Sequence, residues 1–367
     1  MKGNRRLMLG QDARATSKVA PEAQALRGIW LTRGKDGRIT AYAPGEGGLR
    51  RWTEKRPGGP EWDASDVVPL PELTHLSVAQ NAEAYVHFAG RRERPAADGD
   101  GVTVDIVHAI QYQTGRPVSA WNSLGNPHKE PDVGSRFGAP VVVVNGAGEV
   151  NIAVRNGRGG MMVRRERKDG KWRGWEDLRC TRIKEVPAVA VLSTGCIEIF
   201  AVTNKETLHW EQEKPGGGWG DVRRSPAVVR PGSLAVLETS AGRATYYWTD
   251  PESGVVAYRA GVGPMSLGGV PGTGAHAAIR TVLDSFDCTV LAHRGANGAA
   301  AVGVGMTENE ANGVWWSDTG APCVNTPVLT HDALGRVVMA VVGEDGTPRV
   351  ARQTDGPGLS LDEWRVL

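Results

Sequence analysis

The chain has 367 residues, in which 43 lysines and arginines nearly balance 41 aspartates and glutamates, for a formal net charge of +2. Both signs are mixed along the sequence, so no broad basic field is available to hold nucleic acid. No apolar stretch approaches the length of a membrane span, and the first 25 residues contain no apolar core of signal-peptide length. We therefore expect a cytoplasmic protein without nucleic-acid or membrane partners.

Residues 1–25 lack the pattern of the rest of the chain, and we expect them to be an N-terminal leader to a single domain spanning residues 26–367. The chain contains 49 glycines and 22 prolines, and within that domain they separate short apolar runs, which is typical of repeated turns rather than of disorder. Four cysteines (Cys180, Cys196, Cys288 and Cys323) show neither CxxC spacing nor obvious pairing, which predicts free thiols and no cysteine zinc site.

The same sequence pattern of short strands separated by turns recurs seven times along the chain. The clearest unit, residues 187–223, contains apolar or alternating runs at Val189–Leu192, Ile197–Val202 and Leu208–Glu213, and Trp219 is expected to open a fourth strand. The seven units begin at Gly28, His75, Pro140, Pro187, Gly232, His276 and Pro327. One such meander cannot bury both of its faces, whereas a ring of them can. The repeat therefore predicts an all-β, seven-bladed β-propeller of four-stranded antiparallel blades, and its regularity argues against a pair of β-sandwiches.

The second unit is the longest of the seven. Extra residues separate its second and third strands (residues 90–101), and a long connection (residues 126–136) leads to the third unit. In a propeller, both segments belong on the face where the inner strands begin. Two long polar loops on one face predict a rim or lid over a ligand, in which Arg136 is a candidate contact, or else an insertion without a role.

A tryptophan signature marks the middle units. It reads Leu208-His209-Trp210 followed by Gly217-Gly218-Trp219, Trp172 followed by Trp175-Glu176-Asp177-Leu178, and Trp121-Asn122-Ser123-Leu124-Gly125. In these residues the chain resembles the lectin-type propellers of the PLL family, fucose-binding bacterial lectins related to the tectonins, over roughly residues 26–367. The resemblance implies sugar pockets between neighbouring blades, with Trp121, Trp175 and Trp219 as stacking platforms. The alternative is that these three tryptophans wedge between the blades as core.

Positions at which one unit departs from the others indicate a second kind of site. Histidine replaces glycine or proline at the first position of units two and six, as His75 and His276. Four positions further on, units six and seven carry Arg280 and His331, and unit one carries Trp30 between these two positions. Units six, seven and one are neighbours in the ring. We therefore expect Trp30, His276, Arg280 and His331 to share one sector of the central channel.

These residue types together suit acid–base chemistry. Histidine transfers protons near neutral pH, arginine holds a carboxylate or oxyanion, and tryptophan supplies an apolar wall. The candidate catalytic residues are His276, Arg280, His331 and His75, with Trp30 as a ligand contact. Alternatively these polar groups meet channel water, or the three histidines bind a metal. We expect neither metal nor cofactor, since the sequence contains no P-loop, dinucleotide fingerprint, G-x-S-x-G or H-E-x-x-H.

Two functions remain open. The first is a lectin-like propeller that binds a glycan or a small polar ligand. The second is a propeller enzyme with one acid–base site at the channel mouth, acting as a lyase, hydrolase, isomerase or cyclase in natural-product biosynthesis. A multivalent lectin gains avidity from identical pockets, so the divergence of these repeats supports the enzyme. The resemblance to the PLL propellers and the tryptophan-rich repeats support the lectin. We favour the binding function.

Overall fold

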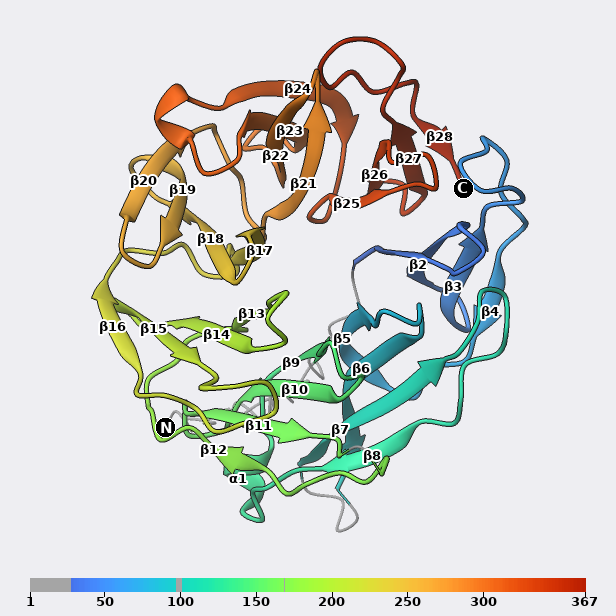
Figure 1. Cartoon of the computed structure of the whole chain (residues 1–367). Coiled ribbons are helices and arrows are strands. Elements are labelled where there is room, and N and C mark those ends of the chain that lie inside the picture. Colours follow the sequence, from blue (N-terminus) through green and yellow to red (C-terminus); the bar gives the residue numbers. More distant parts are fainter. Residues whose placement is uncertain (1–27, 97–100, 168) are drawn as a thin grey trace, which may run out of the picture.

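The computed structural model describes residues 28–96, 101–167 and 169–367, so the expected leader at residues 1–25 lies outside the described residues. Seven four-stranded antiparallel sheets stand around a common axis (Figure 1). The predicted seven-bladed propeller is therefore confirmed. Among the described residues, no helix has the length and apolarity needed to cross a membrane.

Each blade is formed by four consecutive strands, with the first strand of each blade at the axis. Blade 1 contains β1 (Trp30–Arg33), β2 (Ile39–Gly45), β3 (Gly48–Thr53) and β4 (Asp66–Val68). Blade 2 contains β5 (Leu73–Gln80), β6 (Val86–Pro95), β7 (Val102–Gln111) and β8 (Asn122–Gly125), and the short helix α1 (Pro131–Gly134) follows it. Blade 3 contains β9 (Pro140–Val144), β10 (Val150–Arg155), β11 (Met161–Arg165) and β12 (Glu176–Asp177). Blade 4 contains β13 (Ala188–Val191), β14 (Ile197–Val202), β15 (Glu206–Glu211) and β16 (Arg223–Pro226).

The remaining three blades follow the same order. Blade 5 contains β17 (Ala235–Ser240), β18 (Arg243–Asp250), β19 (Gly254–Arg259) and β20 (Gly263–Gly268). Blade 6 contains β21 (Ala277–Leu283), β22 (Phe286–Arg294), β23 (Ala299–Met306) and β24 (Trp315–Pro322), with the 3-10 turn η1 (Glu310–Asn312) before its last strand. Blade 7 contains β25 (Val328–His331), β26 (Val337–Val342), β27 (Pro348–Arg352) and β28 (Arg365–Val366).

The hydrophobic pattern explains the order of the strands within a blade. Second strands such as β14 are buried along their whole length because blades pack on both of their faces, so their sequences are mainly apolar, with Glu198 as the single charged residue of β14. Fourth strands such as β12 and β28 are short and exposed, which suits their place at the outer edge. The predicted fourth strand of blade 4 starts too early, because Trp219 forms only an isolated bridge with Gln212 and β16 begins at Arg223.

The ring closes by packing blade 1 on blade 7, and each of these blades keeps its own four strands. Ile29, Ala43 and Trp52 of blade 1 share a buried cluster with Ala340 and Val350 of blade 7. Figure 1 shows the two blades side by side at the junction of the blue and red ends of the chain.

A glutamate or glutamine directly after the third strand satisfies the first amide of the second strand in several blades. In blade 1, the Ile39 amide donates to Glu54 Oε2 at 2.8 Å. In blade 4, the Ile197 amide donates to Gln212 Oε1 at 3.0 Å, and in blade 7 the Val337 amide donates to Gln353 Oε1 at 3.1 Å. The amide-bearing glutamines show that this contact does not require a charge.

The extra length of blade 2 is partly strand rather than loop, because β6 continues to Pro95 and β7 begins at Val102. Residues 97–100 of the expected loop lie outside the described residues. Arg91 joins this long hairpin to the following connection, since its Nε donates to Phe137 O at 2.6 Å and its Nη2 to Ser135 O at 2.8 Å. The two long segments therefore pack on each other at one face of the ring.

Candidate ligand-binding site

The structure separates the expected channel residues. His276 directly precedes β21, whereas His331 is the last residue of β25, so these histidines lie toward opposite ends of the inner strands. Arg280 is exposed on β21, and its Nε and Nη2 donate to the carboxylate of Asp287 at 2.7 and 2.6 Å. Of these three residues, only His331 lines a hollow at the channel mouth.

His276 is buried between blades 5 and 6. Its Nε2 lies 3.0 Å from Thr249 Oγ1, and its ring stands edge-on to His293 at 5.6 Å. Burial lowers the pKa of His276 to about 3, so the imidazole is neutral at physiological pH. In this environment it does not exchange a proton near neutral pH.

The other two residues of the expected channel set are Trp30 and His75. Trp30 packs with Tyr42 and Phe88 in the cluster between blades 1 and 2. Its ring lies so close to Gly28, which has φ +143°, that a Cβ there would stand 2.9 Å from the indole. His75 is exposed on β5, with its Nδ1 3.1 Å from Thr74 Oγ1. The structure therefore does not bring His75, His276, Arg280 and Trp30 together.

The three signature tryptophans lie half-buried between blades. Trp121 packs in the same cluster as Trp30, and Trp219 packs in the cluster between blades 3 and 4. Trp175 donates from Nε1 to Leu124 O at 3.2 Å and stands edge-on to Phe137 at 5.2 Å. Arg136 is exposed two residues beyond α1. The contacts of the tryptophans are those of wedges between blades.

A hollow of about 640 Å³ opens where the inner strands of blades 7, 1 and 2 end. We call it the channel-mouth hollow. Gln80, at the end of β5, accepts from Arg33 N at 3.1 Å and donates to Arg33 O at 2.9 Å, which fixes blade 2 to blade 1. The Arg33 guanidinium crosses to blade 7, where Nη1 donates to Asp332 O at 2.7 Å. His331 and Thr330 complete this side of the wall.

A second hollow of about 360 Å³ adjoins the first between blades 1 and 2. We call it the inter-blade hollow. It is formed by the turns that follow β1, β5 and β7, and Lys35 and Ala84 line both hollows. Tyr85 and Tyr112 stand edge-on in its wall, with ring centroids 5.2 Å apart, and Tyr112 is 53% exposed. An aromatic ring that packs edge-on against a second ring and stays open to solvent offers an apolar face to a ligand.

Polar groups surround the two tyrosines. Thr114 Oγ1 donates to Asp36 Oδ1 at 3.1 Å, and Arg38 Nε donates to Asp36 Oδ2 at 2.7 Å. Burial alone raises the pKa of the Asp36 carboxyl, but these hydrogen bonds outweigh it and leave the pKa below its usual range. Lys35 pairs with Glu83 at the rim, where both side chains are largely exposed. The hollow therefore presents ionised acceptors beside an aromatic face.

Sequence reasoning missed the inter-blade hollow because its residues lie in turns, whereas the departures from the repeat that indicated a site lie on or directly before the inner strands. Strand register supplies the missing signal. In blades 1, 2, 3, 4 and 7, the same cross-strand pair lies just before the second strand and after the third, and in blade 2 this pair is Tyr85 with Tyr112. The residues equivalent to Tyr85 in blades 1, 3, 4 and 7 are Arg38, Glu149, Cys196 and Arg336. Those equivalent to Tyr112 are Lys55, Arg167, Glu213 and Thr354. Blade 2 thus departs from these four blades at both positions.

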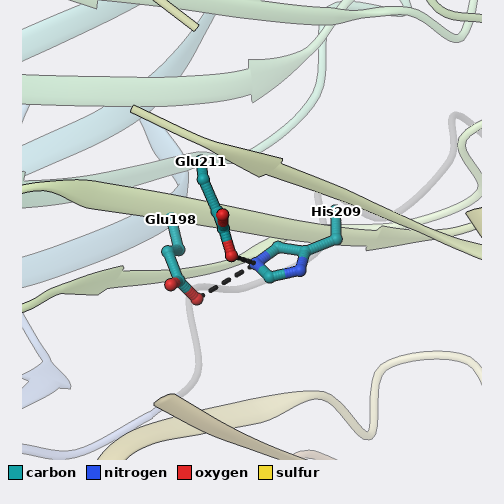
Figure 2. A group of neighbouring side chains, drawn as sticks. All are labelled: Glu198, His209 and Glu211. Atoms are coloured by element: carbon teal, nitrogen blue, oxygen red, sulfur yellow. Dashed lines mark hydrogen bonds and ion pairs between the residues drawn. The ribbon is translucent and has the colours of Figure 1, made fainter. Parts of the chain in front are cut away.

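A cluster of polar side chains on blade 4 consists of Glu198, His209 and Glu211 (Figure 2). His209 Nε2 lies 3.0 Å from Glu198 Oε2 and 3.7 Å from Glu211 Oε1, and Tyr246 of blade 5 hydrogen-bonds to Glu198. Glu198, His209 and Glu211 have the donor types of a metal site. However, Arg223 pairs with Glu211, and its Nη2 lies 3.2 Å from His209 Nδ1.

The Arg223 guanidinium decides between a metal site and an ion network. Because it donates to His209 Nδ1, the imidazole proton lies on Nε2 and is directed at Glu198. A metal would need that Nε2 lone pair, and the guanidinium already balances a carboxylate charge. The arrangement fits a hydrogen-bonded ion network that is buried at Glu198 and His209, exposed at Arg223, and tied to blade 5 through Tyr246.

No protein-family model matches this chain, and no curated protein matches it. Among solved structures, it is similar to the BP39L lectin from Burkholderia pseudomallei, with 14% identity and a TM-score of 0.67 over 93% of this chain and 99% of that chain. It is also similar to AofleA from Arthrobotrys oligospora, with 11% identity and a TM-score of 0.52 over 81% of this chain and 87% of that chain. A leech intramolecular trans-sialidase gives 10% identity and a TM-score of 0.52 over 83% of this chain and 79% of that chain. At these identities the likeness establishes the β-propeller fold.

Proposed function

We propose that this protein is a lectin-like β-propeller that binds a glycan in the inter-blade hollow of blades 1 and 2, with a sugar ring lying on Tyr112. The observation that carries the proposal is the edge-on pair of Tyr85 and Tyr112 in a concave surface lined by carboxylates, an amide and a hydroxyl. The C–H face of a pyranose packs on an aromatic ring, and its hydroxyls donate to ionised carboxylates. Asp36 is held in the ionised state that such acceptance requires.

Two further observations support a binding function. The fold is similar to that of the BP39L lectin over nearly the whole of both chains, and the tryptophan signature resembles that of the PLL and tectonin propellers. The acid–base alternative needs His276, Arg280 and His331 in one place. The buried position of His276 and the ion pair of Arg280 with Asp287 disfavour that alternative.

A glycan array that includes fucosylated and O-methylated sugars tests the proposal. We expect Tyr112→Ala to weaken binding of the best glycan by at least about tenfold, which corresponds to about 1.4 kcal/mol, because the stacking face is removed. Phe286→Ala is the matched control, since Phe286 is also an exposed aromatic residue (57%) but lies on blade 6. Equal binding by the wild-type protein and Tyr112→Ala, or binding of no glycan at all, would contradict the proposal.

The number of sites is a separate expectation. Blades 1, 3, 4 and 7 lack both tyrosines at the equivalent positions, and within the described residues Tyr112 is the one exposed tyrosine, so we expect about one glycan per chain. Isothermal titration calorimetry with a monovalent glycan measures this stoichiometry directly. A value of several glycans per chain would show that the gaps between other blades bind sugar as well.

A further inference from the structure

The two adjoining hollows differ in charge. The described residues that line the channel-mouth hollow include two cationic side chains, Arg33 and Lys35, and neither aspartate nor glutamate. Burial and the nearby Arg33 lower the pKa of His331, so its imidazole adds little positive charge at physiological pH. The inter-blade hollow contains Asp36 and Glu83 beside Lys35. A ligand that spans both hollows therefore meets hydroxyl acceptors at one end and a positive field at the other.

Arg33 supplies most of this positive field. The partner of its guanidinium within the described residues is the Asp332 carbonyl oxygen, which bears no net charge. The Asp332 carboxylate faces other cations, since it pairs with Arg336 at 2.8 Å and with Arg352 at 3.4 Å. Arg33 is anchored by a backbone carbonyl, and its charge is left available to a ligand.

Lys35 stands at the junction of the two hollows. Its pair with Glu83 is a surface ion pair, with side-chain exposures of 65% and 60%. Such pairs contribute little to stability, so the ammonium can turn from Glu83 toward an anion in the channel mouth at little cost. Neutral donors accompany the cations, because the amide of Asn81 and the hydroxyl of Thr330 line the same hollow. The Gln80 amide is already engaged, since it donates to the carbonyl oxygens of Arg33 and Ala84.

We propose that the ligand is an acidic saccharide, whose carboxylate or sulfate group lies in the channel-mouth hollow near Arg33 and Lys35 while an adjacent ring lies on Tyr112. The inference rests on the proposed function, because it assigns a chemical class to the glycan of the same site. An anion in the channel mouth would meet charge-assisted donors from blade 1 and the Asn81 amide from blade 2. A neutral saccharide would leave the basic end of the site without a partner.

Matched pairs of glycans test the proposal on an array: sialylated against desialylated chains, galacturonan oligomers against their methyl esters, and sulfated against desulfated galactans. We expect an acidic member to bind at least about tenfold more tightly than its neutral partner at physiological salt. Arg33→Gln and Lys35→Gln should each remove most of this preference. Lys35→Gln is the safer variant because the Lys35 side chain is exposed, and Arg173→Gln, an exposed arginine on blade 3, is the control.

The outcomes separate the two proposals. Equal binding of acidic and neutral partners that still depends on Tyr112 would overturn the acidic class and leave the lectin function intact. Binding of acidic glycans that is indifferent to Tyr112 but falls equally in Arg173→Gln would show non-specific charge attraction and overturn the class assignment. Failure of every glycan to bind would overturn both.

Discussion

Arg352→Gln is expected to lower the free energy of unfolding by about 3–5 kcal/mol, because it leaves a buried carboxylate without its cation. Arg352 Nη2 lies 2.5 Å from Glu54 Oε1 across the closing junction of the ring. The Glu54 and Asp332 side chains are 0% exposed, and that of Arg352 is 7% exposed. Water cannot replace the lost partner at this depth. A urea unfolding titration measures the change.

Two further variants test whether the loss of stability in Arg352→Gln comes from the buried, unpaired carboxylate. Arg349 lies on the same strand as Arg352, but its partner Asp345 is 53% exposed. We therefore expect Arg349→Gln to lower the free energy of unfolding by at most about 1 kcal/mol. Adding Glu54→Gln to Arg352→Gln should recover much of the stability, because Gln212 and Gln353 already satisfy the equivalent amides in blades 4 and 7. Equal losses in Arg352→Gln and Arg349→Gln would contradict this account of the junction.

The second large effect is a loss of stability in mild acid that originates in two pairs of buried histidines. In blade 2, His87 Nδ1 lies 3.2 Å from His108 Nε2, and burial lowers the pKa of His87 to about 4 and that of His108 to about 3. In blade 6, burial lowers the pKa of His276 to about 3 and that of His293 to about 4. All four imidazoles are neutral in the folded protein at physiological pH.

The sign of the pH dependence follows from these shifts. Each folded-state pKa lies below the ordinary value of 6.5, so the unfolded chain binds protons first as the pH falls. Stability is therefore fully present well above pH 6.5 and is lost progressively from about pH 6.5 down to the folded-state values of about 4 and about 3. At pH 5 the blade 2 pair alone should account for a loss on the order of 3 kcal/mol relative to pH 7. Glu185, whose pKa burial raises to about 7, acts in the opposite direction.

His87→Asn combined with His108→Gln isolates the histidine effect. An asparagine amide stands near the place of Nδ1 and a glutamine amide near that of Nε2, so the variant can keep a hydrogen bond but cannot titrate. Urea midpoints measured from pH 7 to pH 5 should fall less steeply in the variant than in the wild type. Glu185 is common to both proteins and cancels in the comparison. Parallel midpoint curves would show that the blade 2 pair does not cause the acid sensitivity.

Much of the fold was predictable from the sequence because strand and turn chemistry repeats locally. The buried second strand Ile197–Val202 is rich in β-branched and aromatic residues, and its predicted bounds are confirmed. The prediction was wrong at Trp219, where an aromatic residue that bridges to Gln212 resembles the start of a strand. The extended hairpin of blade 2 was also misjudged, because charged residues such as Arg91 and Arg92 occur in a strand there.

The candidate site was less accessible to sequence reasoning. Positions counted from the start of each unit indicate which strand a residue belongs to, but not which end of the channel it reaches. His276 precedes its inner strand and His331 ends its own, so the length of an inner strand separates the two histidines. Tyr85 and Tyr112 come together only through the pairing of β6 with β7, in which Val86 faces Gln111. Their proximity depends on register across a hairpin whose length the sequence does not reveal.

The most direct measurement is a crystal structure of the protein in complex with the glycan that binds best on the array. The predicted result is a sugar ring stacked on Tyr112 in the inter-blade hollow, with any acidic group directed toward Arg33 and Lys35. A glycan bound instead in the gaps beside Trp121, Trp175 or Trp219, with Tyr112 uncovered, would contradict the proposed site.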